Sequence, residues 1–189
     1  DIFLPYISQL TTLDELYIDI SSVISRYLNT PGRHKQSLVQ SSQEAWIKLY
    51  KSTPSSIDTQ VSYYNLGALT AMCLDLLLRD KSSSLVELLR SLWISPHILL
   101  SGYTRDDILR FTDSVDTSIS RYLVEWLDTP NSLNIEECLS IVGLRISKEK
   151  TNANIQGISL RSTDRAFTVT RIELGSPAMK CGLIKGDNL

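Results

Sequence analysis

The residues best able to do chemistry in this sequence are two histidines, and their spacing does not group them. His34 follows Pro31-Gly32-Arg33, and His97 follows Pro96. A zinc hydrolase needs ligands close together, most simply two histidines one helical turn apart with a glutamate between them. Neither histidine has a second histidine or cysteine at that spacing, so both are interpreted as loop or surface residues. We therefore expect no metal ligands within this chain.

The three cysteines, Cys73, Cys138 and Cys181, are far apart, and each has apolar neighbours. Cysteines in such surroundings are most often buried free thiols. This interpretation is favoured over a disulfide or a metal role, and it leaves the redox compartment open.

Other catalytic signatures are missing from the sequence. It has no glycine-rich phosphate loop, no Gly-x-Ser-x-Gly elbow and no Cys-His signature. The adjacent carboxylates Asp106-Asp107 and Glu136-Glu137 would point to different sides of a helix, as first-turn residues that complement the helix dipole. Residue types and spacing alone therefore identify no reaction.

Composition predicts a globular protein with a substantial core. Of 189 residues, 42% are hydrophobic and 21% charged, and the formal net charge is −2. Lys and Arg are scattered, which argues against a nucleic-acid partner. The most apolar run, Ala68 to Leu78, contains Asp75 and is far shorter than the ~20 residues that cross a bilayer. We expect a soluble protein, cytoplasmic or periplasmic, that does not span a membrane.

The two ends of the sequence are expected to be cuts. No initiator Met or signal-peptide pattern is present at the start, and the final Gly186 to Leu189 has no terminating element.

Apolar residues recur at helical spacing from Leu13 to about Leu127. Side-chain oxygens followed three residues later by a carboxylate predict helix starts. The pairs are Thr12 with Glu15, Ser84 with Glu87, Thr104 with Asp107 and Asn134 with Glu137. The longest helix is predicted from about Gln60 to Arg79, and residues 128–131 resemble a linker.

Beyond Gly143 the pattern becomes β-rich. Short runs at Leu144 to Ser147, Ile155 to Leu160 and Phe167 to Ile172 predict strands of a small β domain.

Two long blocks resemble, in order and spacing, the helical half of the catalytic domain of the glycyl aminopeptidase family of zinc peptidases. The first block runs from Pro31-Gly32-Arg33 through Gln36-Ser37-Leu38 to the stretch from Glu44 to Tyr50. The second runs from Gln60 to Gly67 and continues through Leu74-Asp75-Leu76, Leu92-Trp93 and Gly102-Tyr103-Thr104. The resemblance implies a mainly α fold, with residues 1–130 forming the helical-bundle subdomain of a thermolysin-like peptidase.

A third block looks like the first part of a bacterial-type PDZ domain, with Cys181 where Ala is usual. It comprises Ile155-Gln156-Gly157-Ile158, Val169 to Ile172, Gly175-Ser176-Pro177-Ala178 and Cys181 to Asp187. Residues 131–142 are then a linker and residues 143–189 a truncated PDZ domain. The resemblance implies that Gln156, Gly157 and Ile158 form a loop whose backbone donors bind the C-terminus of a peptide. The alternative is that the domain serves only for packing.

For the catalytic part, the resemblance implies that the zinc site and the general-base glutamate lie upstream of this chain. It also implies peptide substrates with N-terminal Gly or Ala. Tyr64 corresponds to the phenol that stabilises the transition state. Arg33, Gln36 and Tyr63 are candidates for the substrate cleft. The alternatives are that Tyr63 and Tyr64 are core aromatics and that Arg33 and Gln36 only fix a loop.

One departure keeps a second hypothesis open. The family usually has Lys or another polar residue before the glycine of the second block, and here that position is Leu66. A parent protein without catalysis, acting as a peptide-binding or scaffolding protein through its PDZ domain, is the alternative. In either case the fragment alone is expected to be inactive.

Overall fold

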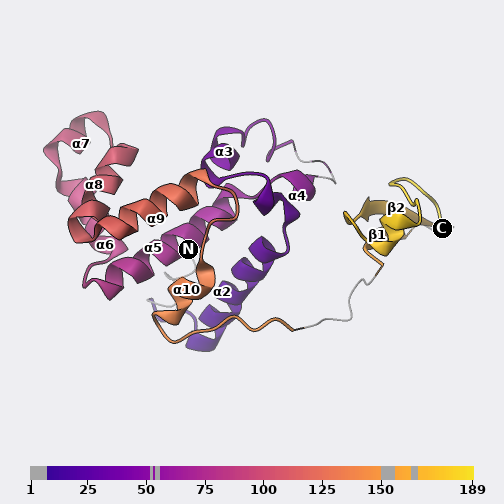
Figure 1. The fold of residues 1–189 in the computed structure, drawn as a ribbon, viewed down its shortest axis with the longest axis horizontal. Helices are drawn as coiled ribbons and strands as arrows, with labels where there is room; N and C mark the ends of the chain where they lie inside the picture. Colours follow the sequence, from indigo (N-terminus) through magenta and orange to yellow (C-terminus); the bar gives the residue numbers. More distant parts are fainter. Residues whose placement is uncertain (1–7, 52, 54–55, 150–155, 163–165) are drawn as a thin grey trace.

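The computed structural model describes residues 8–51, 53, 56–149, 156–162 and 166–189. These residues form a helical body followed by a small β unit at the C-terminus (Figure 1). The predicted mainly α fold with a small β part is confirmed. No helix among these residues combines the length and the apolar character needed to cross a membrane.

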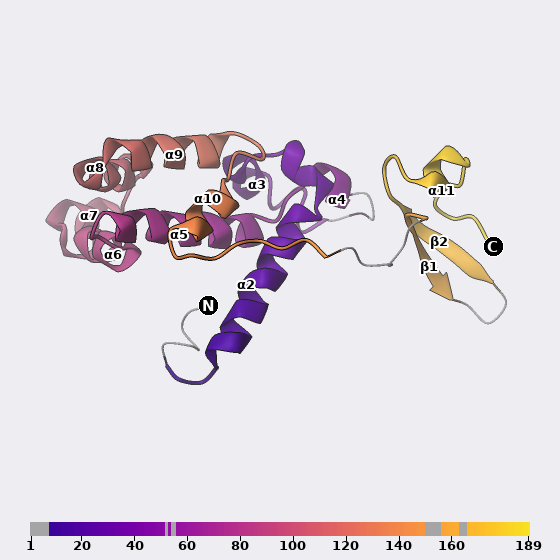
Figure 2. The same cartoon turned by 60° about the horizontal axis from the view of Figure 1, so that its bottom comes forward.

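The helical body is built around one long central helix, α5. In chain order its elements are α2 (Leu13–Leu28), η1 (Pro31–His34), α3 (Leu38–Gln43), α4 (Ser56–Thr59), α5 (Tyr63–Asp80), α6 (Leu85–Ile94), α7 (Pro96–Ser101), α8 (Arg105–Val115), α9 (Thr117–Asp128) and α10 (Ile135–Ser140). Helices α2, α3, α6, α9 and α10 all pack against α5, and Figure 2 shows α9 and α10 running alongside it.

The predicted helix starts are largely confirmed. Thr12 and Thr104 form complete capping boxes with Glu15 and Asp107. Ser84 accepts a hydrogen bond from the Glu87 backbone. Asn134 differs, because its side chain makes no bond to the α10 backbone and instead donates to the Glu137 carboxylate at 3.2 Å.

The core lies mainly between α2, α5, α9 and α10. Its buried members are Ile24, Tyr27, Val61, Leu66, Leu69, Met72, Cys73, Trp126, Leu133, Ile135, Cys138 and Leu139. A second cluster joins the far end of α5 to α9 through Leu74, Leu78, Ile119 and Leu123. The spacing of these residues on α5 places apolar side chains on several faces, as a central helix requires.

Residues 131–142, predicted as a linker, contain α10. Its side chains Ile135, Cys138 and Leu139 are buried in the main core. This segment is therefore packed onto the helical body, and the division of the chain into two domains remains a prediction.

The cysteine prediction is correct at two positions and wrong at the third. Cys73 and Cys138 are buried free thiols, whereas Cys181 is exposed. Cys181 follows the short helix α11 (Pro177–Lys180), whose inward-facing residue is Ala178. An apolar sequence neighbourhood thus did not predict which face of this turn is buried.

The β unit is a two-stranded antiparallel sheet of β1 (Ile158–Ser162) and β2 (Phe167–Ile172), with a bulge between Ser159 and Leu160. An isolated bridge joins Thr168 to Asn188. The strand predicted at residues 144–147 is wrong: Leu144 and Ile146 instead pack, partly buried, against the helical core. Ile155, the predicted start of the next strand, lies outside the described residues.

Candidate active site

Three tyrosine hydroxyls meet at the start of α5. Tyr63 and Tyr64 are the first two residues of the helix, and their rings stack with centroids 4.1 Å apart. The Tyr50 hydroxyl lies 3.0 Å from that of Tyr64 and 3.4 Å from that of Tyr63. Tyr64 is 61% exposed, so it is not the core aromatic that the alternative interpretation expected.

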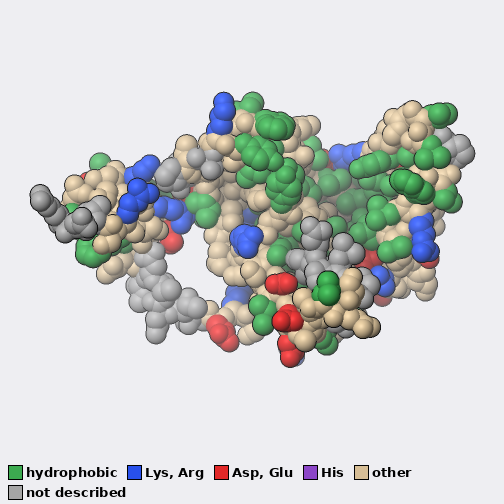
Figure 3. Space-filling view, turned by 180° about the vertical axis from the view of Figure 1, so that it is seen from behind, with side chains coloured by type: hydrophobic (Ala, Val, Ile, Leu, Met, Phe, Trp, Pro, Cys, Tyr) green, Lys and Arg blue, Asp and Glu red, His purple; other side chains and the backbone are tan. Residues whose placement is uncertain are grey.

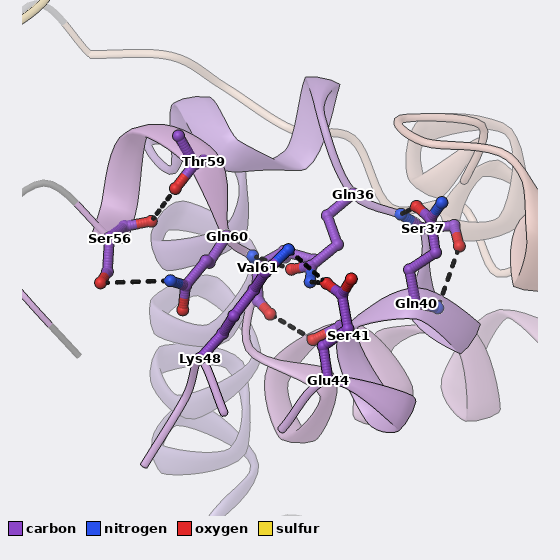
Figure 4. A network of polar contacts seen from close by, with 10 residues as sticks. All are labelled: Gln36, Ser37, Gln40, Ser41, Glu44, Lys48, Ser56, Thr59, Gln60 and Val61. Carbon is purple, nitrogen blue, oxygen red and sulfur yellow. Dashed lines mark hydrogen bonds and ion pairs between the residues drawn. The ribbon is translucent and has the colours of Figure 1, made fainter. Parts of the chain in front are cut away.

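The position of α5 is fixed by a buried polar network around Val61, two residues before the helix (Figure 4). The Val61 N–H donates to Gln36 Oε1 at 3.0 Å, and the Ser41 hydroxyl donates to the Val61 carbonyl. Gln36 Nε2 in turn donates to the Glu44 carboxylate at 2.8 Å. Gln36 and Ser41 are buried, at 5% and 3% exposed. We call Gln36, Ser41, Glu44 and Val61 the Val61 network.

This network explains why α5 begins later than predicted. The sequence predicted a start near Gln60, whereas the helix starts at Tyr63 with Ser62 as its cap. Because both backbone groups of Val61 are bonded to side chains of the preceding segment, Val61 is held outside the helix.

Gly32 lets this segment approach closely. A Cβ added there would lie 2.1 Å from the carbonyl oxygen of Gln60, a distance that real side chains do not reach. The neighbouring Arg33 places its guanidinium 5.6 Å from the centre of the Tyr27 ring and donates to His34 at 3.2 Å. The Pro-Gly-Arg motif thus packs the loop onto both α2 and the chain leading into α5.

Two further contacts tie the first turn of α5 to the body. Asn65 is buried, and its amide donates to the Val23 carbonyl of α2 at 3.1 Å. Leu66, the residue that departs from the family pattern, is buried in the main core. The first turn therefore exposes Tyr64 while Asn65 and Leu66 anchor it.

The structure gives the predicted cleft residues different surroundings. Gln36 uses its amide within the Val61 network, and Arg33 lines a pocket of about 590 Å³ with Glu136 and Glu137. Tyr63 and Tyr64 do not line that pocket. Tyr63 and Tyr64 stand together, and the cleft roles of Arg33 and Gln36 remain predictions.

Sequence reasoning missed Tyr50 as a partner of this pair. Tyr50 belongs to the stretch that follows α3, and its ring lies 5.0 Å from that of Trp46. A contact across 14 residues and a turn leaves no periodic signal that could have revealed it.

Hydrogen bonding sets the acidities in the cluster. The hydrogen bond with Tyr50, with a smaller effect from Tyr63, lowers the pKa of Tyr64 below its ordinary value of 10.0. The same Tyr50 contact raises the pKa of Tyr63. Bonds from Lys48 and then Gln36 lower the pKa of Glu44. A hydrogen bond that the anionic form accepts lowers a pKa, whereas one that the neutral hydroxyl donates raises it.

An apolar groove begins one helical turn beyond Tyr64. It has a volume of about 960 Å³, and Gly67, Ala71 and Leu74 of α5 line one wall. Residues of α3, α6, α7, α8 and α9 and of the turn between α7 and α8 line the rest, including the exposed Leu89, Trp93 and Tyr103. Figure 3 shows hydrophobic side chains gathered over this end of the molecule, at the right of the view.

The predicted peptide-binding loop leads directly into β1. Gly157 is buried with φ of +69°, and a Cβ there would lie 2.3 Å from the Ser176 Cβ. The Gln156 and Gly157 carbonyls accept hydrogen bonds from Ala178 and Glu173. The loop is therefore folded against the start of α11, while its binding of a peptide C-terminus remains a prediction.

The described residues do not supply a zinc site. Within the part of the chain that the structure describes, no group of three His, Cys, Asp or Glu residues could hold a metal ion. The ligands of the zinc that the resemblance implies are thus not found among the described residues.

One solved structure shares the fold. It is the aminopeptidase N family protein from Idiomarina loihiensis, with a TM-score of 0.85 and 24% identity over 99% of this chain. The chain spans 35% of the length of that structure. A search of curated proteins found no match.

The sequence also matches a family model, that of the M61 glycyl aminopeptidases, over residues 1–70. The matched region contains η1, α3, the Val61 network and the start of α5. Residues 1–70, which carry Tyr50, Tyr63 and Tyr64, are thus similar to the M61 glycyl aminopeptidases.

Proposed function

We propose that this chain is the helical part of a zinc aminopeptidase that removes N-terminal Gly or Ala from peptides, and that Tyr64 stabilises the transition state. The observation that carries the proposal is the placement of Tyr64. Its phenol is exposed on the first turn of α5, while Asn65, Leu66 and the Val61 network fix the backbone beneath it.

The chemistry of peptide hydrolysis explains the value of such a phenol. When water adds to the peptide carbonyl, negative charge develops on the carbonyl oxygen. A hydrogen-bond donor already in place can stabilise that charge without rearranging. One such donor stabilises the transition state by on the order of 3 kcal/mol. Tyr64 also lies at the positive end of an 18-residue helix, which adds a favourable field for an oxyanion.

Zinc and the general base are proposed to come from sequence outside residues 1–189. The described residues offer no group that could hold the metal, and the chain spans 35% of the solved structure that it matches. The chain by itself is expected to be inactive.

The second candidate, a peptide-binding protein acting through a PDZ domain, is supported by the loop at residues 156–158. This loop opens onto β1, and strand addition beside such a strand is how extended peptides bind sheets. The departure from the family pattern at Leu66 is the other feature that favours this candidate. Burial of Leu66 in the main core accounts for a leucine at that position without a loss of activity.

The experiment is hydrolysis of glycyl, alanyl and leucyl chromogenic amides by the longer protein that contains this chain, with and without a chelator. The proposal predicts cleavage of the glycyl and alanyl amides at least about tenfold faster than of the leucyl amide, and loss of activity with chelator. Zinc should restore it. Hydrolysis that is unaffected by the chelator would reject the proposal in favour of another mechanism. The absence of hydrolysis together with binding of peptide C-termini would favour the second candidate.

A further inference from the structure

Tyr50 contacts the hydroxyls of both tyrosines at the start of α5. We infer that Tyr50 is a positioning residue for Tyr64: its hydroxyl donates a hydrogen bond to the Tyr64 oxygen and so directs the Tyr64 proton outward, toward a bound peptide. This inference rests on the proposed function, because it describes how the same phenol is oriented.

The geometry places Tyr50 between the two phenols of α5. Its oxygen is 3.0 Å from the Tyr64 oxygen and 3.4 Å from the Tyr63 oxygen. A phenol has one proton to donate, so Tyr50 can donate to only one of these two neighbours and can accept from the other. The distances leave the donor of each contact open, and the inference assigns the Tyr50 proton to the shorter contact, the one with Tyr64.

The acidities agree with this direction. The contact with Tyr50 lowers the pKa of Tyr64, as expected for an oxygen that accepts a hydrogen bond. The same contact raises the pKa of Tyr63, as expected for a hydroxyl that donates one. The hydrogen bonds then run from Tyr63 to Tyr50 and from Tyr50 to Tyr64.

This direction determines where the Tyr64 O–H points. Since the Tyr64 oxygen accepts from Tyr50, its own O–H points away from Tyr50 and is free to donate to another acceptor. A hydroxyl that accepts a hydrogen bond is also polarised into a stronger donor. Both effects suit a group that must donate to a developing oxyanion.

The fold holds Tyr50 in place through the Val61 network. The Tyr50 N–H donates to the Ala45 carbonyl at 3.0 Å, and Ala45 is buried. Glu44 precedes Ala45 and accepts from Gln36 at 2.8 Å, while Gln36 also accepts from Val61 at 3.0 Å. One buried glutamine therefore fixes both the turn that carries Tyr50 and the chain that leads into Tyr64.

The test is a titration that needs no catalysis. The 189-residue chain is labelled at the ring carbon that bears the tyrosine hydroxyl, and NMR follows each phenol from neutral to alkaline pH. The Tyr64 signal is the one missing from the Tyr64→Phe variant. Tyr50→Phe keeps the ring that packs on Trp46 and removes only the hydroxyl, and Tyr103→Phe serves as a matched control because Tyr103 is exposed beside the groove.

We expect Tyr50→Phe to raise the Tyr64 pKa by at least about 0.5, and Tyr63→Phe to raise it by less, because Tyr50 makes the larger contribution to the lowered Tyr64 pKa. Tyr103→Phe should leave it unchanged. A Tyr64 pKa that is the same in Tyr50→Phe and in the control would overturn the inference.

A kinetic measurement separates this inference from the proposed function. In the longer protein, Tyr50→Phe should lower kcat about tenfold with KM within about twofold, because the lost contact orients a group used in the transition state. Full activity of Tyr64→Phe would reject the proposed function itself. Loss of activity in Tyr64→Phe, combined with wild-type kcat in Tyr50→Phe, would reject the role of Tyr50 alone.

Discussion

The two ends of α5 are held in different ways. At its start, the chain is fixed by directed hydrogen bonds from buried polar side chains, Gln36 and Ser41, to the backbone of Val61. Toward its end, the helix is held by apolar packing, with Leu74 and Leu78 against Ile119 and Leu123 of α9. The apolar groove lies beside this second region.

The two kinds of contact constrain the helix differently. Hydrogen bonds to a backbone group specify distance and direction, whereas apolar packing specifies mainly volume. The region that carries the exposed Tyr64 phenol uses the first kind of contact. The region without such a group uses the second.

The largest effect on stability is expected from a substitution at Gly32, where the loop lies close to the Gln60 backbone at the polar end of α5. Gly32→Ala puts a methyl group 2.1 Å from the Gln60 carbonyl, so the backbone must move, and we expect a loss of about 3 kcal/mol in the free energy of unfolding. Gly67→Ala is the matched control, since its Cβ would lie 3.9 Å from Leu38 and the position is helical. That control should stabilise by about 0.5 kcal/mol. Chemical denaturation measures both, and equal effects would contradict the close-approach argument.

The apolar end should respond to volume. Leu78 is fully buried, so Leu78→Ala should cost about 3 kcal/mol through lost burial and a cavity. Leu89, on the groove wall and 57% exposed, should cost less than about 0.5 kcal/mol when changed to Ala. Both values come from urea denaturation, and a large loss in Leu89→Ala would show that the groove wall is packed in solution.

The Val61 network is tested by removing its central amide. Gln36→Leu keeps the volume and leaves the Val61 N–H without its acceptor, which we expect to cost about 2 kcal/mol. Hydrogen exchange of the Val61 amide should accelerate more than that of Leu78 in the other region. Gln43→Leu, at an exposed position of α3, is the control and should change neither quantity appreciably. Unchanged exchange at Val61 in Gln36→Leu would contradict the network.

The smallest expected effect is a pH dependence that arises from Glu44. Hydrogen bonds from Lys48 and Gln36 lower its pKa below 4.5 in the folded protein. Its contribution to stability is therefore present above the unfolded pKa and is lost as pH falls through the lower folded value. Stability curves between pH 6 and acid should fall less steeply in Glu44→Gln than in the wild type. Parallel curves would mean that the bonds from Lys48 and Gln36 to Glu44 add no stability.

Sequence reasoning reached the fold class and much of the helix layout because apolar periodicity and capping pairs are local signals. Thr12 and Thr104 showed where helices begin. The resemblance supplied Tyr64 as a candidate, and the structure then showed it exposed beside Tyr63.

The remaining features depend on contacts between distant residues. Gln36 was a candidate for the cleft, yet its bonds run to Glu44 and Val61, the latter 25 residues away. The run at residues 144–147 alternates like a strand, but its apolar side chains pack on helices and the segment pairs with no strand in the described part of the chain. Local patterns carry no information about which partner such residues meet.

The most direct test of the central claim is the steady-state kinetics of Tyr64→Phe in the longer protein, with Tyr103→Phe as the matched control on an equally exposed ring. If Tyr64 stabilises the transition state, its variant should lose about a hundredfold in kcat on glycyl amides with little change in KM and in stability, and the control should behave as wild type. Wild-type kcat in Tyr64→Phe would show that this phenol takes no part in the reaction.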